Sequence, residues 1–118
     1  MADPSGQAAE ERGVHNPRVV DLIRLDLAAD AVELLMLETR PWTGGAAQLA
    51  ELEAKFNAYL GYVQGGYLAR DYPQYAGRGV RFHLACAELP EGDAARMLVA
   101  MRDFALREGI AFEVSAAE

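Results

Sequence analysis

The sequence predicts an α+β fold, a two-layer sandwich in which two helices cover one face of a four-stranded mixed sheet. Three observations support this class: four apolar segments have the length of strands, two longer segments repeat with a helical period, and glycine or proline separates most of them. Their order is ββαβαβ, without internal repeats. Right-handed crossovers then place both helices on the same face, and we expect the third and fourth strands to run parallel.

The first two strands form a predicted hairpin. Residues 19–25 and 31–38 are apolar runs, the first rich in β-branched side chains, and the five residues from Asp26 to Asp30 join them. Runs rich in leucine and methionine can also be helical, but Asp26 and Asp30 stand too close together to bound helices of ordinary length. We therefore predict two short strands joined by a turn.

A long helix is predicted over residues 46–64. Its apolar residues recur at spacings of three and four and form one stripe: Leu49, Leu52, Phe56, Tyr59, Leu60 and Val63. Thr43 is the expected N-cap, and Gly65 with Gly66 is the expected stop. Glu51 and Lys55 are four residues apart, which predicts an ion pair on the opposite side of the helix.

The rest of the chain supplies a loop, two strands and a second helix. Residues 67–79 show no sustained period and are predicted to form an ordered loop, whereas residues 80–86 alternate as a strand does. The second helix opens at residues 90–93 and ends before Gly109, its expected C′ residue. Residues 110–114 alternate again and form the last predicted strand.

We expect a single domain over residues 17–118, preceded by a disordered tail over residues 1–16. The tail is polar, with one isolated Val14, and offers too little apolar surface to offset the cost of ordering. Residues 1–13 lack the apolar core of a secretory signal, and no stretch reaches the length of a membrane span. A cytoplasmic location is therefore expected.

The formal net charge of −7, from 18 acidic and 11 basic side chains, limits the partners of this chain. An acidic protein repels phosphate backbones and anionic lipid unless a local basic patch reverses the field. We therefore expect no nucleic-acid partner and no membrane surface. An acidic surface is suited instead to basic protein partners.

The residues that commonly carry catalysis are poorly placed for it. Cys86 and His83 lie three positions apart on one strand, so their side chains point to opposite faces and cannot form a dyad. Cys86 shares its face with apolar residues and is expected to be buried and inert, and as the single cysteine it has no disulfide partner. His15 lies in the tail, far from His83, and Ser115 lies near the C-terminus outside any nucleophile motif. We predict no catalytic residue, no cofactor and no metal.

Tyrosines gather in one region and suggest a binding surface. All five in the chain fall between residues 59 and 75, around the predicted loop. Tyr59 belongs to the helix stripe, and a structural role that pins the loop onto the helix end is favoured for Tyr67 and Tyr72, whereas Tyr62 and Tyr75 have no such explanation. The candidate ligand or partner residues are Tyr62, Tyr67, Arg70, Tyr72, Tyr75 and Arg78.

A second, weaker candidate is the turn before the long helix. Free N–H groups at a helix N-terminus bind anions, and Arg40 followed by Thr43, Gly44 and Gly45 would place a cation and a flexible turn there. The alternative is an ordinary capped helix, because the turn matches no phosphate-binding motif.

The hairpin has apolar residues on both of its faces. Leu35 and Leu37 lie opposite the face that carries Val32, Leu34 and Met36, and only one face can meet the helices. Either the tail or a second copy of the chain must cover the other. Because the tail is polar, we favour self-association, with Leu35 and Leu37 in a homodimer interface.

Several short motifs resemble a known family. They are residues 16–23 (NPRVVDLI), Arg40-Pro41-Trp42, the run Lys55-Phe56-Asn57-Ala58-Tyr59-Leu60 and Asp71-Tyr72-Pro73. On these residues the chain resembles a family of small bacterial proteins known only as a domain of unknown function, over about residues 16–114. The resemblance implies a compact bacterial α+β protein and no particular chemistry.

Two functional hypotheses remain open at this point. The first is a non-enzymatic cytoplasmic interaction or accessory protein that acts as a homodimer. The second is a small-molecule binding protein or enzyme, with its pocket between the tyrosine-rich region and the turn from Arg40 to Gly45.

Overall fold

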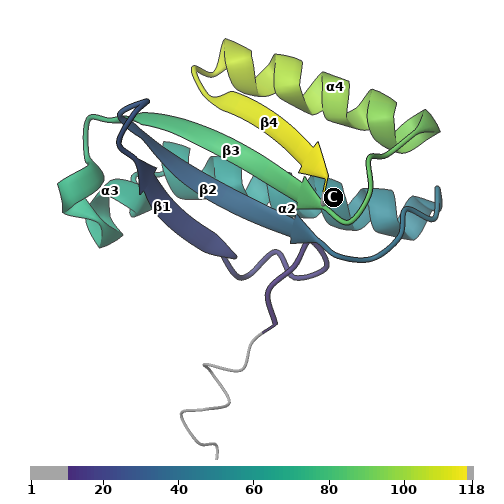
Figure 1. Ribbon diagram of the computed structural model, residues 1–118. Helices are drawn as coiled ribbons and strands as arrows, with labels where there is room; N and C mark the ends of the chain where they lie inside the picture. The colour runs from purple at the N-terminus through teal and green to yellow at the C-terminus, as the bar shows by residue number, and fades with distance from the viewer. Residues whose placement is uncertain (1–10, 117–118) are drawn as a thin grey trace, which may run out of the picture.

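The computed structural model describes residues 11–116 and shows one mixed sheet with two long helices on one of its faces (Figure 1). The strands are β1 (Leu22–Asp26), β2 (Ala31–Glu38), β3 (Gly79–Cys86) and β4 (Ala111–Ala116), and the long helices are α2 (Ala46–Gln64) and α4 (Gly92–Arg107). The sheet order is β1-β2-β3-β4. β1 is antiparallel to β2, whereas β2, β3 and β4 are mutually parallel. The predicted fold class and the parallel pairing of the last two strands are confirmed.

The strand register separates an apolar face from a polar one. Leu34 of β2 pairs with Phe82 of β3, which pairs with Phe112 of β4, and all three are buried beneath the helices. The next layer, Glu33 with Arg81, faces the other way because side chains alternate along a strand. We call this second side the open face, since no helix of the described residues covers it.

The two helices cover the apolar face through aromatic and aliphatic contacts. Phe56 of α2 lies with its ring centroid 6.0 Å from that of Phe82 and 5.7 Å from that of Phe112. α4 buries residues at spacings of three and four: Ala94, Leu98, Met101 and Ala105. The predicted apolar stripes therefore do form the core.

Lys55 departs from the sequence prediction. Instead of pairing with Glu51 at the surface, it is 0% exposed and its ammonium lies 2.8 Å from the equally buried carboxylate of Asp21. Two further hydrogen bonds from Lys55 Nζ reach the carbonyl oxygens of Asn16 at 2.7 Å and Val19 at 2.6 Å. The prediction was wrong because a charge four residues away on a helix gives no information about partners that lie far along the chain.

Tyr59 completes this buried polar cluster one helical turn further on. Its hydroxyl accepts a hydrogen bond from the Asp21 N–H at 2.8 Å and donates one to the Leu35 carbonyl at 2.5 Å. The Asp21 carboxylate also accepts from the N–H groups of Leu37 and Gly13. We call Asp21, Lys55 and Tyr59 the buried triad; it joins α2 to β2 and to the segment before β1.

The end of the predicted tail contributes to the folded domain. Val14 is 1% exposed, belongs to the core, and donates its N–H to the Leu37 carbonyl at 2.8 Å. The prediction of disorder over residues 1–16 is therefore wrong at Val14, because the hydrogen bonds around this single valine help to keep it in the core. Residues 1–10 of that segment lie outside the described residues.

Two local predictions need correction. The predicted loop 67–79 contains a short helix, α3 (Tyr67–Asp71), and a 3₁₀ turn, η1 (Pro73–Tyr75). Gly66 adopts φ +83°, a left-handed conformation that lets α2 end and α3 begin at once. Thr43 is also not the N-cap: that position belongs to Gly45, and the Thr43 hydroxyl instead donates to Gln48 and accepts from the Gly45 N–H.

We expect Asp21→Asn to destabilise the protein by about 3–5 kcal/mol, because the Lys55 ammonium would stay buried without a carboxylate. Urea unfolding of the variant beside wild type measures this loss. Asp103→Asn, at an exposed position on α4, is the matched control and should leave the free energy of unfolding nearly unchanged. A loss below about 1 kcal/mol in Asp21→Asn would contradict the structural importance of the pair.

Candidate functional site

The open face carries a network of charged side chains centred on Glu33. Although no helix of residues 11–116 covers this face, Glu33 is only 2% exposed, because its cross-strand neighbours fold over it. Arg24 Nε donates to its Oε1 at 2.6 Å, and Arg81 Nε and His83 Nδ1 lie 3.0 Å from its Oε2. Arg81 also donates to Asp26 at 2.8 Å. The network spans the three strands β1, β2 and β3.

These contacts determine the acidity of the carboxylates. Burial would raise the pKa of Glu33, but the hydrogen bonds from Arg24 and His83 outweigh it and hold that pKa below its usual value. The hydrogen bond from Arg81 lowers the pKa of Asp26 in the same way. Both carboxylates are therefore ionised at neutral pH, and the network alternates in sign across the sheet.

His83 also links Glu33 to a hydroxyl on another strand. Its Nε2 lies 2.7 Å from the Ser115 Oγ, so with the proton on Nδ1 the imidazole donates to Glu33 and accepts from Ser115. This is the connectivity of a Ser-His-carboxylate triad. Sequence reasoning missed it because the three residues come from three strands, and only the register of β2, β3 and β4 brings them together.

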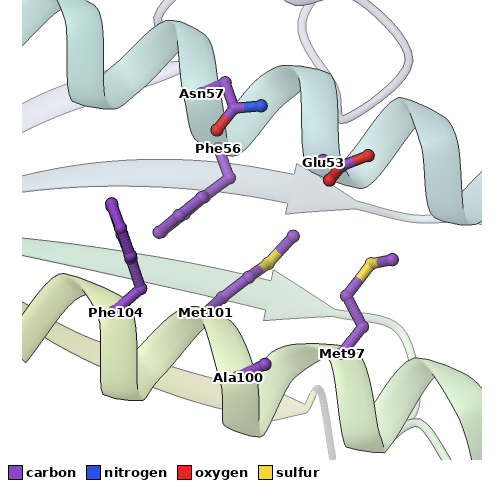
Figure 2. A pocket seen from close by; sticks show the side chains of 7 residues that line it. All are labelled: Glu53, Phe56, Asn57, Met97, Ala100, Met101 and Phe104. Carbon is purple, nitrogen blue, oxygen red and sulfur yellow. The ribbon is translucent and has the colours of Figure 1, made fainter.

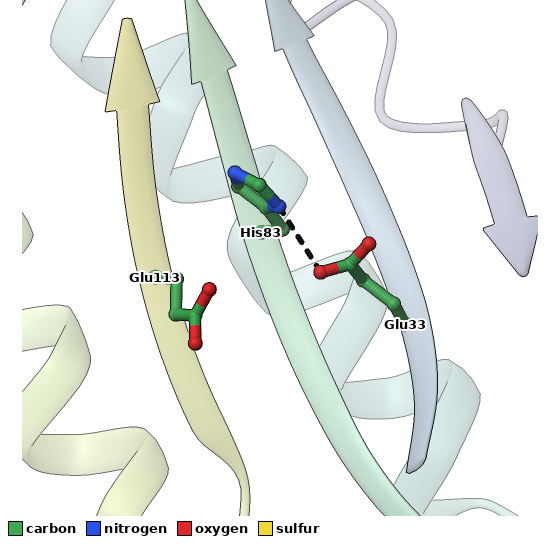
Figure 3. A group of neighbouring side chains, drawn as sticks. All are labelled: Glu33, His83 and Glu113. Carbon is green, nitrogen blue, oxygen red and sulfur yellow. Dashed lines mark hydrogen bonds and ion pairs between the residues drawn. The ribbon is translucent and has the colours of Figure 1, made fainter. Parts of the chain in front are cut away.

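The same region contains a group with metal-ligand chemistry. Glu33, His83 and Glu113 each offer one ligand atom, and these atoms lie within 4.8 Å of one another (Figure 3). The oxygens of Glu33, however, already accept hydrogen bonds from two guanidinium groups and the imidazole. A cation here would face the positive charge of Arg81, which lies 3.9 Å from Glu113. These carboxylates are therefore better suited to pairing with Arg24 and Arg81, as they do in the structure, than to binding a metal ion.

The tyrosine-rich region is tied together by contacts within the chain. Tyr62 stacks on Tyr67 with centroids 6.5 Å apart, and Tyr72 stacks on Tyr75 at 5.6 Å. The Tyr62 hydroxyl donates to Asp71 at 3.0 Å, and burial together with that carboxylate raises the pKa of Tyr62 to about 12. These contacts favour the packing interpretation for most of the ring surface.

The two arginines of the tyrosine-rich region are also engaged. Arg70 lies over the Tyr67 ring, 4.8 Å from its centroid, and pairs with Asp71. Arg78 pairs with Asp30 in the turn between β1 and β2. Tyr67 remains the most exposed of the rings that we identified as candidates, at 47%.

The turn before α2 is less suited to an anion than the sequence suggests. Arg40 donates to Glu38 at 2.7 Å and to Glu51 at 2.8 Å, and these bonds raise the pKa of its guanidinium further. Its positive charge is thus already matched by two carboxylates. Gly44 adopts φ +74° and Gly45 is the N-cap, so both serve the helix entry.

The two candidate regions do not share a pocket. The turn from Arg40 to Gly45 precedes α2, whereas the tyrosines lie in the C-terminal half of α2 and in the segment after it. A helix of 19 residues is roughly 28 Å long, so the proposed common pocket is wrong. A separate cavity of about 350 Å³ lies beside Tyr62 and Tyr67, against residues 17–20.

The remaining candidates lie near the end of the sheet. Leu35 is only 7% exposed and Leu37 is half-buried, both on the open face. Leu37 lines a hollow of about 380 Å³ with Ala85 and Ser115. Cys86 is buried on the helix side as expected, and burial raises the pKa of its thiol to about 11.

A groove on the helix side was not anticipated from the sequence. Figure 2 shows side chains of α2 and α4 pointing into the space between the two helices. The groove encloses about 410 Å³, and its apolar lining is Phe56, Met97, Ala100, Met101 and Phe104, with Glu53 and Asn57 at the rim. Helical periodicity predicts buried stripes, but it does not reveal that two stripes leave a gap between them.

Comparison with known proteins identifies the family. A model described as a family of unknown function, DUF6572, matches residues 13–118. The chain belongs to this family. The match begins just before Val14, in agreement with the place of that residue in the core. No curated protein and no solved structure matches the chain. Among the described residues, no helix is both long enough and apolar enough to cross a bilayer.

We expect the stabilising effect of Glu33 to depend on pH. Its folded-state pKa lies below the usual value of 4.5, so its contribution is present above that pH and is lost as the pH falls through the folded-state pKa. The difference in Tm between wild type and Glu33→Gln should therefore be largest near neutral pH and shrink in acid. Thermal unfolding at about pH 7 and about pH 3 measures it.

Asp103→Asn, with its side chain 53% exposed on α4, serves as the control for this comparison. Its Tm should follow wild type at both pH values. A Glu33→Gln difference that stays constant with pH would show that the carboxylate charge contributes nothing to folding.

Proposed function

We propose that this protein is a non-enzymatic, cytoplasmic protein-interaction module that acts as a homodimer, and that the two copies meet through their open faces. The observation that carries the proposal is the uncovered side of a mainly parallel sheet. Sheets of parallel strands are found almost only with both faces covered. Here β2, β3 and β4 are parallel, and the helices cover one side (Figure 1). A second copy supplies the missing layer.

The charges at the two edges of the open face favour a second copy as the occupant. Arg24, with a side chain 55% exposed, lies on edge strand β1, and Glu113 lies on the opposite edge strand β4. A twofold axis along the strands places β1 of one copy over β4 of the other. Across the sheet, Arg24 is in register with Ala111 of β4. Glu113 lies two residues beyond Ala111, a separation that long side chains can span.

Apolar surface at one end of the open face adds to the fit. Leu22 is 41% exposed, and Leu37 lines the hollow next to Ala85. Leu35, the other leucine predicted for the interface, is already covered within one copy and has little surface left to bury. We therefore assign the apolar part of the interface to Leu22 and Leu37.

We expect wild type to be a dimer, and Arg24→Glu and Glu113→Arg each to be monomeric, because each variant places like charges opposite one another. An equimolar mixture of the two variants should form a heterodimer. In that heterodimer the introduced carboxylate of one variant meets the introduced guanidinium of the other, and the two unchanged residues, Arg24 and Glu113, meet as in wild type. Native mass spectrometry measures all four samples at equal concentration. Asp103→Arg, on the outer side of the helix layer, is the control and should remain a dimer.

The mixing result separates a specific interface from loss of folding. Thermal unfolding checks that each variant is folded, and Leu37→Glu provides a second route to a monomer if Arg24→Glu does not fold. A wild-type protein that stays monomeric at about 200 µM, or two folded variants that do not combine, would refute the proposal.

A second candidate function is ester hydrolysis, favoured by the hydrogen-bonded chain from Glu33 through His83 to Ser115. In this reaction His83 takes the hydroxyl proton while Ser115 Oγ attacks the ester carbonyl carbon. The alcohol leaves with that proton, and water then releases the acid from Ser115. The two functions exclude each other on this face, because a second copy would cover Ser115.

p-Nitrophenyl acetate is the probe that tests the second candidate. Turnover above the buffer rate that disappears in both Ser115→Ala and His83→Gln would establish it. Equal rates for wild type and Ser115→Ala would eliminate it, whatever the oligomeric state.

A further inference from the structure

The groove between α2 and α4 is lined mainly by apolar side chains from both helices. Met97, Met101 and Phe104 recur at four- and three-residue spacings on α4, and Phe56 faces them from α2 (Figure 2). Grooves of this kind accept the apolar face of an amphipathic helix. Ala100 is too small to close the gap, so the space of about 410 Å³ stays open.

The apolar side chains of the groove keep surface available to a partner. Phe104 touches Phe56, with centroids 6.3 Å apart, yet it is 41% exposed. A phenylalanine so placed supplies a large apolar contact area. Met97, which is half-buried, adds a flexible, polarisable side chain that adapts to different ligand shapes, whereas Met101 and Phe56 are buried and form the floor of the groove.

The charge around the groove indicates the chemistry of the partner. Because Lys55 is buried with Asp21, the exposed charged side chains of α2 are the carboxylates Glu51 and Glu53. Glu51 is paired with Arg40, whereas Glu53 has no ion-pair partner among residues 11–116. Glu108 follows directly after α4 and accepts a hydrogen bond from Gln64, the last residue of α2. Arg107, whose guanidinium lies over the Phe104 ring 5.9 Å from its centroid, is a cation beside Phe104. The charged residue that lines the groove itself is Glu53, so the charge available to a partner there is negative.

We propose that this groove binds a basic amphipathic helix of a partner protein. The apolar face of that helix lies on Phe104, Met97 and Ala100, the apolar lining residues that keep exposed surface, and its cationic residues meet Glu53 at the rim. A second copy of this chain is a poorer occupant, because a copy seated here through its own helices would bring a second Glu53 to the rim.

The inference extends the proposed interaction function and stands on a separate surface. The groove is lined by α2 and α4, on the helix side of the sheet. The proposed dimer interface lies on the opposite side of the sheet, which the two long helices leave uncovered (Figure 1). A dimer can therefore bind one helix on each of its outer sides. Failure of the dimer leaves the groove intact, and failure of the groove leaves the dimer intact.

The test uses a fluorescein-labelled synthetic peptide of about four helical turns, built from leucine and lysine in an amphipathic order. Fluorescence anisotropy with the full-length protein should give saturable binding with a Kd below about 100 µM. A peptide of the same composition in scrambled order, and one with glutamate in place of lysine, should bind at least about tenfold more weakly.

Variants locate the binding. Phe104→Ser should weaken it about tenfold and Glu53→Lys about threefold, whereas Val99→Ser, exposed on α4 away from the groove lining, should leave it unchanged. Circular dichroism checks that Phe104→Ser is folded, and Glu53→Lys tests the surface without touching the core. Equal binding of the ordered and scrambled peptides, or binding insensitive to both groove variants, would overturn the proposal. Occupation by a second copy would appear as a dimer that Phe104→Ser abolishes and Arg24→Glu does not, and it would overturn the proposal as well.

Discussion

The buried triad of Asp21, Lys55 and Tyr59 is the constraint on which the arrangement of the chain depends. An ammonium removed from water is stable only where hydrogen-bond acceptors replace the solvent, and Lys55 has three. Two are backbone carbonyls of the segment before β1, so one helical side chain determines the path of that segment. Tyr59 repeats the connection one turn later by bonding to β2. Sheet order and helix position are thereby linked through polar contacts as well as through the apolar core.

The two sides of the sheet satisfy different physical requirements. On the helix side, aromatic contacts around Phe56 exclude water. On the open face, Glu33 is shielded by the side chains that bind it, so the sheet can leave a polar face uncovered without exposing its central carboxylate. A face of this kind can stay in contact with water. It also presents fixed charges of both signs, and such a pattern favours association in one defined orientation.

Local patterns predicted most of the fold, whereas the site depends on contacts between distant residues. Helical periodicity gave the bounds of α2, and alternation gave the strands, because both patterns arise from neighbouring residues. Lys55 and Asp21 are 34 positions apart, and His83 and Ser115 are 32 positions apart. No local pattern contains these pairings. The groove was not predicted for a related reason: its existence depends on the distance between two helices, each of which was predicted correctly.

The motifs of the family resemblance correspond to the buried triad rather than to an active site. Residues 16–23 include Asp21 and two of the carbonyl acceptors of Lys55, and the run from Lys55 to Leu60 supplies the ammonium and the Tyr59 hydroxyl. The three side chains of the triad are buried and every polar atom among them that we describe is satisfied, so their chemistry is used in folding. The two surfaces on which our proposals rest are held in place by the same elements: β2 lies at the centre of the open face, and α2 forms one side of the helix groove.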